Sequence, residues 1–158
     1  MGGSHSKPVT VDISRYPGGL GDQVKQDDKG GLYYEIGGKV LLTDEWFPDP
    51  EGTYRKITHT PKDGQNISKI SKGGQDQILS PGNLSQYSSV SVYYWGQDHH
   101  CSKPLLIQLG SGNEYYKYVS SGNSWNKDGS ITSSTLREKL DKQNCSRNKA
   151  HIINLEER

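Results

Sequence analysis

Short stretches in which apolar and polar residues alternate dominate the chain, and this period of two is typical of half-buried β-strands. The clearest stretch is 89–95, where Val90, Val92 and Tyr94 point to the same face of the predicted strand. Further strands are predicted over 9–13, 32–36, 39–43, 53–60, 105–109, 115–119 and 152–155, with brief strand-like pieces at 67–70 and 77–79. The pattern therefore predicts a mainly β protein.

Glycine and proline mark two turns between these strands. Gly37-Gly38 separates the strands at 32–36 and 39–43, and two residues that both adopt positive φ suit a tight hairpin. Asp49-Pro50-Glu51-Gly52 predicts a second turn, because proline presets φ and glycine tolerates positive φ. The strands on either side of each turn are expected to pair antiparallel.

One segment near the C-terminus has a helical pattern. Residues 133–144 place Leu136 and Leu140 one turn apart, and Thr135 begins a Thr-x-x-Glu sequence that fits a capping box. A start at Thr132 is an alternative. The apolar stripe is narrow, so we expect this short α-helix to need docking on the sheet for its stability.

Residues 31–64 and 91–129 share a pattern. Each contains, in the same order, an apolar-Tyr-Tyr strand, a Leu-Leu pair, a tyrosine and a Lys-Asp-Gly triplet. An internal duplication and a chance similarity of two β-meanders both explain this. In either case two meanders would bury their apolar faces together, as an antiparallel β-sandwich or a curved sheet.

Composition and charge limit the class of protein. The 158 residues suit a single domain, placed at 8–158 after a flexible leader or tag remnant at 1–7. Only 30% of the residues are hydrophobic, but a net charge of +1 argues against a disordered chain. The balanced charge disfavours nucleic acid as a partner, and no apolar run approaches the roughly 20 residues that span a bilayer. No signal peptide is visible, and we expect a monomer without a cofactor.

The order and spacing of several motifs resemble a known family. These motifs are Val9-Thr10-Val11-Asp12-Ile13-Ser14, Val90-Ser91-Val92-Tyr93-Tyr94-Trp95, Lys103-Pro104-Leu105-Leu106-Ile107-Gln108-Leu109, Tyr115-Tyr116, and Leu136 followed by Lys139-Leu140-Asp141 and Asn144-Cys145. Together, over residues 8–155, they resemble an expanded family of uncharacterised modular proteins of Theileria-type piroplasm parasites, in which the module occurs singly or in tandem. The resemblance brings no catalytic residues. It implies a host-facing module that is secreted or displayed on the parasite surface.

No catalytic constellation is visible, so we expect a protein that is not an enzyme. Asp98-His99-His100-Cys101 offers metal-ligand types, but neighbouring ligands on an extended loop point apart. A polar loop without metal is therefore expected there. Cys101 and Cys145 either form a disulfide or remain separate thiols, since sequence alone does not show whether they meet in space.

If the module binds a host protein, we expect loops to carry the site. The candidate loops are Gln97–Ser102, Gly110–Glu114 and Asp44–Glu51. If the duplication holds, the last two lie at the same end of the sheet, because each follows a Leu-Leu strand. That end would present Trp46, Phe47 and Asn113 to a partner. Alternatively, the two aromatic rings pack over the sheet edge as part of the core.

Two other functions are open. A lectin-like module would stack sugar rings on an outward Trp95 or Trp125. A structural spacer of a surface coat would need no soluble partner. The chain also contains three glycosylation sequons, at Asn66, Asn83 and Asn144, which fit a secreted protein but are common in a chain rich in Ser and Asn.

Overall fold

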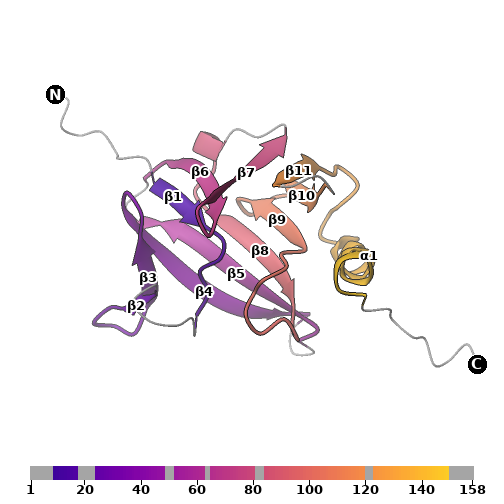
Figure 1. The fold of residues 1–158 in the computed structure, drawn as a ribbon, viewed down its shortest axis with the longest axis horizontal. Coiled ribbons are helices and arrows are strands. Elements are labelled where there is room, and N and C mark those ends of the chain that lie inside the picture. Colours follow the sequence, from indigo (N-terminus) through magenta and orange to yellow (C-terminus); the bar gives the residue numbers. More distant parts are fainter. Residues whose placement is uncertain are drawn as a thin grey trace, which may run out of the picture.

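A computed structural model describes residues 9–17, 24–48, 52–62, 65–80, 84–119 and 123–149. In this part of the chain, eleven strands form one sheet that is followed by one α-helix (Figure 1). The strands are β1 (Val9–Asp12), β2 (Lys25–Gln26), β3 (Leu32–Glu35), β4 (Lys39–Phe47), β5 (Tyr54–Pro61), β6 (Ile67–Lys72), β7 (Gln75–Ser80), β8 (Val90–Trp95), β9 (Leu106–Leu109), β10 (Tyr115–Tyr118) and β11 (Ser124–Lys127). The helix α1 spans Leu136–Asn148, and a 3₁₀ turn covers Leu84–Gln86. The predicted mainly β fold with a C-terminal helix is confirmed.

The sheet is continuous and curved, with the strand order β1-β6-β7-β11-β10-β9-β8-β5-β4-β3-β2 (Figure 1). The curvature brings β1, at one end of the sheet, close to the end of β3, near the opposite edge. The amide of Thr10 on β1 donates a hydrogen bond to the carbonyl of Ile36, which follows β3, at 3.1 Å. Of the two predicted arrangements, the curved sheet is the one observed, because all the described strands belong to one hydrogen-bonded sheet rather than to two facing sheets.

The sheet is not entirely antiparallel. Antiparallel pairing runs without interruption from β2 to β11, but β11 then pairs parallel with β7 and β1 pairs parallel with β6. The sheet is therefore mostly antiparallel, as expected for meanders, with two parallel pairings that the sequence did not predict. Alternation along a strand shows which residues face the core, but it does not specify which distant strand lies alongside.

Alternation divides the apolar residues between the two faces of the sheet. Val90, Val92 and Tyr94 of β8 point together, as predicted, into a large inner core within the curve of the sheet. Tyr93 of the same strand points to the opposite face, where it joins residues of α1. This smaller outer core consists of Tyr54, Tyr93, Leu105, Leu106, Tyr115, Ile131, Leu136 and Leu140.

The glycine pairs at the hairpins serve different purposes. In the predicted β3–β4 hairpin only Gly37 has a positive φ, of 80°. Gly38 is needed for space, since a Cβ there would lie 2.4 Å from both a Gln65 oxygen and a Val9 methyl carbon. The pair that does adopt positive φ at both positions, 58° and 93°, is Gly73-Gly74 in the turn between β6 and β7.

Helix α1 starts and ends later than the predicted range of 133–144. The predicted capping box is wrong, because Thr135 makes no side-chain cap hydrogen bond. Its hydroxyl instead accepts a hydrogen bond from the Thr132 amide at 2.8 Å and donates one to the Ser130 carbonyl at 2.9 Å. The expectation that the apolar stripe docks on the sheet is confirmed, since Leu136 and Leu140 are buried in the outer core.

Several boundaries differ from the sequence prediction. β4 continues through 44–47, which was expected to be loop, and β11 was not predicted. The expected leader at 1–7, the strand at 152–155 and residues 49–51 of the predicted turn lie outside the described residues. No helix in the described ranges is both long enough and apolar enough to cross a membrane.

Both segments of the proposed duplication form antiparallel meanders, but their matched residues do not all face the same way. Leu42 faces the inner core, whereas its match Leu106 faces the outer core. Tyr54 faces the outer core, whereas Tyr116 faces the inner core. The duplication remains a hypothesis, and the Leu-Leu pairs are not in structural register.

Candidate functional site

The strand register shows which predicted residues share an end of the sheet. Phe47 of β4 pairs with Tyr54 of β5, which pairs in turn with Trp95 at the C-terminal end of β8. The other end of β8 pairs with the end of β9, from which the loop 110–114 begins. The expected grouping of Trp46 and Phe47 with Asn113 was therefore wrong, because β4 and β9 run in opposite directions.

The loop that does lie beside Phe47 is 97–102, which follows Trp95. Asp98 organises this loop, since its carboxylate accepts hydrogen bonds from the amides of Ser102, at 3.1 Å, and Lys103, at 2.9 Å. Cys101 within it has an uncommon left-handed φ of 50°. No group of three His, Cys, Asp or Glu side chains in the described ranges is arranged to hold a metal ion.

Trp46 is the most exposed aromatic residue that the structure describes, with 54% of its surface accessible. It lies on β4 and points to the same face as the inner core, beyond the edge of the core itself. Its ring lies against Gly52, where a Cβ would be 3.4 Å from two indole carbons. The indole is thus supported on one side and open to solvent on the other.

An ion pair stands beside this indole. Arg55 of β5 is paired across the strands with Trp46, and its guanidinium binds both carboxylate oxygens of Asp44 at 2.8–3.0 Å. The guanidinium also donates to the Pro17 carbonyl at 3.0 Å and lies 5.7 Å from the Tyr16 ring centre. Arg55 is therefore fixed from several sides, so the polar neighbours of Trp46 are held in place.

The other predicted binding aromatics are packed into the protein. Phe47 rests edge-on against Tyr93, with the ring centres 6.0 Å apart, and Trp95 packs partly against the outer core. Trp125 is 1% exposed, and its indole nitrogen donates to the Gln77 side-chain oxygen at 2.9 Å. The prediction of Trp125 as a sugar-stacking residue was wrong, because the ring fills the inner core. Asn113 is exposed.

Cys101 and Cys145 are not joined by a disulfide in the structure. Cys101 is buried in the inner core, and its sulfur lies 3.5 Å from a guanidinium nitrogen of Arg55. Cys145 lies on α1, which covers the outer face. Burial raises the pKa of the Cys101 thiol to about 12, so this group is an unreactive neutral thiol near neutral pH.

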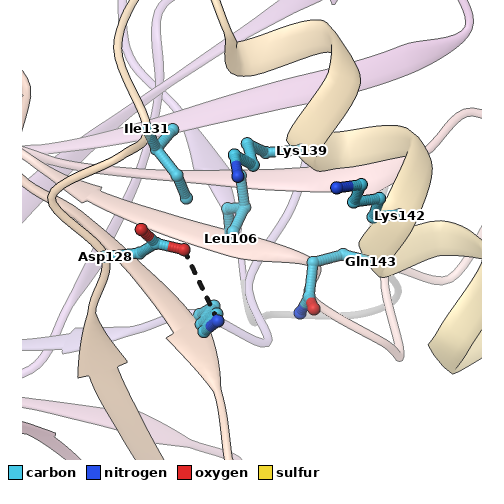
Figure 2. Close-up of a pocket in the computed structure, with 7 residues that line it drawn as sticks. Leu106, Asp128, Ile131, Lys139, Lys142 and Gln143 are labelled. Carbon is cyan, nitrogen blue, oxygen red and sulfur yellow. Dashed lines mark ion pairs between the residues drawn. The ribbon is translucent and has the colours of Figure 1, made fainter.

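A pocket of about 230 Å³, here called the α1 pocket, opens between the helix and the outer face of the sheet (Figure 2). Seven residues line it: Leu106, Lys117, Asp128, Ile131, Lys139, Lys142 and Gln143. Buried Leu106 and Ile131 provide apolar surface, and Lys139, Lys142 and Gln143 extend from α1 (Figure 2). This site was not predicted, because its residues come from four separate stretches of the chain.

The charges around the α1 pocket are unequal. Asp128 forms an ion pair with Lys117 at 3.5 Å, and hydrogen bonds from Ser130 lower the pKa of Asp128 below its usual value. Lys142 lies 3.8 Å from Glu138, with both side chains well exposed. The side chain of Lys139 makes no ion pair with any residue that the structure describes.

No family model, curated protein or solved structure matches this chain. The resemblance to piroplasm parasite proteins remains a hypothesis that rests on the motifs alone.

Proposed function

We propose that this chain is a non-enzymatic binding module that contacts a protein partner through Trp46. The observation that carries the proposal is the exposed indole, 54% accessible and supported from behind by Gly52. An aromatic ring that is already ordered loses little conformational entropy when a partner covers it. The resemblance to a host-facing parasite family suggests a host protein as the partner, with secretion or display on the parasite surface.

The neighbours of Trp46 support a protein contact. Tryptophan and arginine are enriched among the residues that dominate binding energy at protein interfaces. Here Trp46 and Arg55 are directly paired across β4 and β5, and the Asp44–Arg55 ion pair is fixed on the same face. The surface thus combines an exposed apolar anchor, Trp46, with the partly exposed carboxylate of Asp44, which the mostly buried Arg55 holds in place.

Three carboxyl groups of the described residues are unsuited to act as general acids. A carboxyl group that acts as a general acid near neutral pH needs a raised pKa. Burial favours a higher pKa for Asp12, but hydrogen bonds from Ser14, Gly73 and Arg15 outweigh it, and the pKa is lowered. The pKa values of Asp27 and Asp128 are also lowered, mainly by hydrogen bonds from Gly31 and Ser130.

Affinity capture with a matched pair of variants tests the proposal. Immobilised wild type, Trp46→Ala and Ile78→Ala are each exposed to host serum and cell lysate. Ile78 is the matched control, because its apolar side chain is 59% exposed but lies on β7. We expect Trp46→Ala to weaken binding of a captured protein by about 30-fold, as for an interface hot spot, and Ile78→Ala to retain it.

Equal retention of every partner by Trp46→Ala would exclude this surface as the binding site. Capture of no partner by the wild type would contradict the binding module and favour a structural spacer. A glycan array covers the lectin-like alternative: a saccharide signal that Trp46→Ala abolishes contradicts a protein partner. Both substitutions are at exposed positions, so we expect their unfolding free energies to stay within about 0.5 kcal/mol of wild type.

A further inference from the structure

The α1 pocket is independent of the Trp46 surface. It lies on the outer face of the sheet, beneath the helix, whereas Trp46 shares a face with the inner core. Its lining combines two buried apolar side chains with three lysines and one carboxylate (Figure 2). Three ammonium groups against one carboxylate leave the lining with an excess of positive charge.

The single carboxylate is already occupied by its neighbours. One oxygen of Asp128 accepts hydrogen bonds from the Ser130 amide and hydroxyl, at 2.9 and 2.5 Å, and the other faces the Lys117 ammonium at 3.5 Å. Asp128 therefore holds Lys117 at the edge of the pocket. It does not form an ion pair with Lys139 or Lys142.

Neither of the two lysines on α1 has a strong ion-pair partner among the described residues. Lys139 has no ion-pair partner within the described residues, and the contact of Lys142 with Glu138 is long and exposed. An exposed pair of this kind contributes little free energy, so a ligand can displace it at low cost. Because the two lysines are three residues apart on α1, they lie on the same side of the helix.

The size and charge of the pocket define a ligand class. A volume of about 230 Å³ has room for a small polyatomic anion with a short carbon chain attached. A phosphate monoester carries a charge of about −1.5 to −2 at neutral pH and offers three acceptor oxygens. Lysine ammonium groups bind phosphate as point charges, and a short carbon chain would contact Leu106 and Ile131.

We propose that the α1 pocket binds the phosphate group of a small phosphate monoester, with Lys139 and Lys142 as the principal contacts. Lys117 supplies a third positive charge at the edge, and the buried Leu106 and Ile131 take the short carbon chain. Such a group occurs in free metabolites and in phosphorylated serine side chains of proteins.

Amide chemical-shift titration of the full chain tests this assignment. The probes are O-phosphoserine, a short phosphoserine peptide, unmodified serine and acetate. We expect either phosphorylated probe to shift the amides around Lys117, Asp128 and Lys139–Gln143, whereas serine and acetate do not. A peptide that binds at least about tenfold more tightly than the free amino acid would identify a phosphorylated partner, and equal affinities would identify a small molecule.

Charge-matched variants show whether the pocket is responsible. Lys139→Gln should weaken binding by at least about tenfold, since it removes a hydrogen bond to a charged group. Lys62→Gln, which removes an exposed lysine outside the pocket, should change the affinity less than about twofold. Asp128→Asn should strengthen binding by about threefold, because it removes the one negative charge from the lining.

Three results would overturn the assignment. The first is the absence of shifts at the pocket with both phosphorylated probes. The second is an equal loss of affinity in Lys62→Gln and Lys139→Gln, which would indicate non-specific electrostatic attraction of the phosphate to the protein surface. The third is binding of acetate as tight as that of phosphoserine. Dispersed amide spectra of each variant confirm that it is folded before its affinity is compared.

Discussion

At the residue scale, His59 shows how the inner core treats a polar side chain. Its Nδ1 lies 2.8 Å from the Tyr34 hydroxyl, which also accepts a hydrogen bond from the Asp12 amide at 3.0 Å. The hydroxyl proton is thus available to the imidazole, while Nε2 has no hydrogen-bond partner among the described residues. Desolvation lowers the pKa of His59 from 6.5 to about 3, so the ring is neutral at neutral pH.

This burial predicts a pH-dependent stability. Above about pH 6.5, His59 is neutral in both the folded and the unfolded chain and has no effect on the pH dependence. Below that value only the unfolded chain gains the proton, so the free energy of unfolding should fall by about 1.4 kcal/mol per pH unit towards the folded pKa. Urea unfolding between about pH 6 and pH 4.5 measures this slope before Asp12 titrates.

Two variants identify the group responsible. His59→Phe should flatten the slope in that window, since it removes the titrating ring but retains an aromatic contact with Tyr34. His99→Gln should leave the slope unchanged, because His99 is exposed. An unaltered slope in His59→Phe would show that another group causes the pH dependence.

At the element scale, α1 depends on the sheet beneath it. Leu136 and Leu140 are buried against the outer core, and the Tyr54 hydroxyl on β5 donates a hydrogen bond to Asp141. The Gln143 side chain donates to the Leu105 carbonyl at 3.2 Å. Docking, rather than an N-terminal side-chain cap, therefore stabilises the helix.

Truncation of one docking residue measures this dependence. Leu140 is fully buried, so Leu140→Ala should lower the free energy of unfolding by about 2–5 kcal/mol. Glu138→Gln, at an exposed position on the same helix, should change it by less than about 1 kcal/mol. Chemical unfolding followed by far-ultraviolet circular dichroism compares the two. A similar small effect of both variants would mean that α1 is not docked in solution.

At the scale of the whole molecule, one curved sheet encloses one inner core. Val9 and Val11 of β1, the first described strand, pack in the same core as Trp125 of β11, the last described strand. Parallel pairings of β1 with β6 and of β7 with β11 connect the parts of the sheet that are distant in sequence. Loss of either connection would open the common core.

This architecture predicts one cooperative unfolding transition. Tryptophan fluorescence, which reports on buried Trp125, and circular dichroism should give coincident denaturation curves. A reducing agent should not shift the midpoint, because Cys101 and Cys145 are not joined. Two separate transitions would contradict the single core, and a lower midpoint under reducing conditions would reveal a disulfide.

The sequence by itself determined the local structure, because local structure depends on neighbouring residues. Alternation placed Val90, Val92 and Tyr94 on one face, and glycine marked the β3–β4 hairpin. The narrow leucine stripe predicted a helix that has to dock. The local pattern did not determine the helix cap or the hairpin turn. The Thr135 hydroxyl bonds to the Ser130 carbonyl, and Gly38 is required because Gln65 and Val9 lie against it.

Only the tertiary structure decided the pairing of distant strands and therefore the positions of the candidate sites. The directions of β4 and β9 separate Trp46 from Asn113, and parallel pairing of β11 with β7 buries Trp125, although both tryptophans had been candidate binding residues. The α1 pocket forms because docking brings Lys139 near Lys117. The physical reason is that exposure and electrostatic interaction depend on the distance between side chains, and a single sequence specifies that distance only for near neighbours.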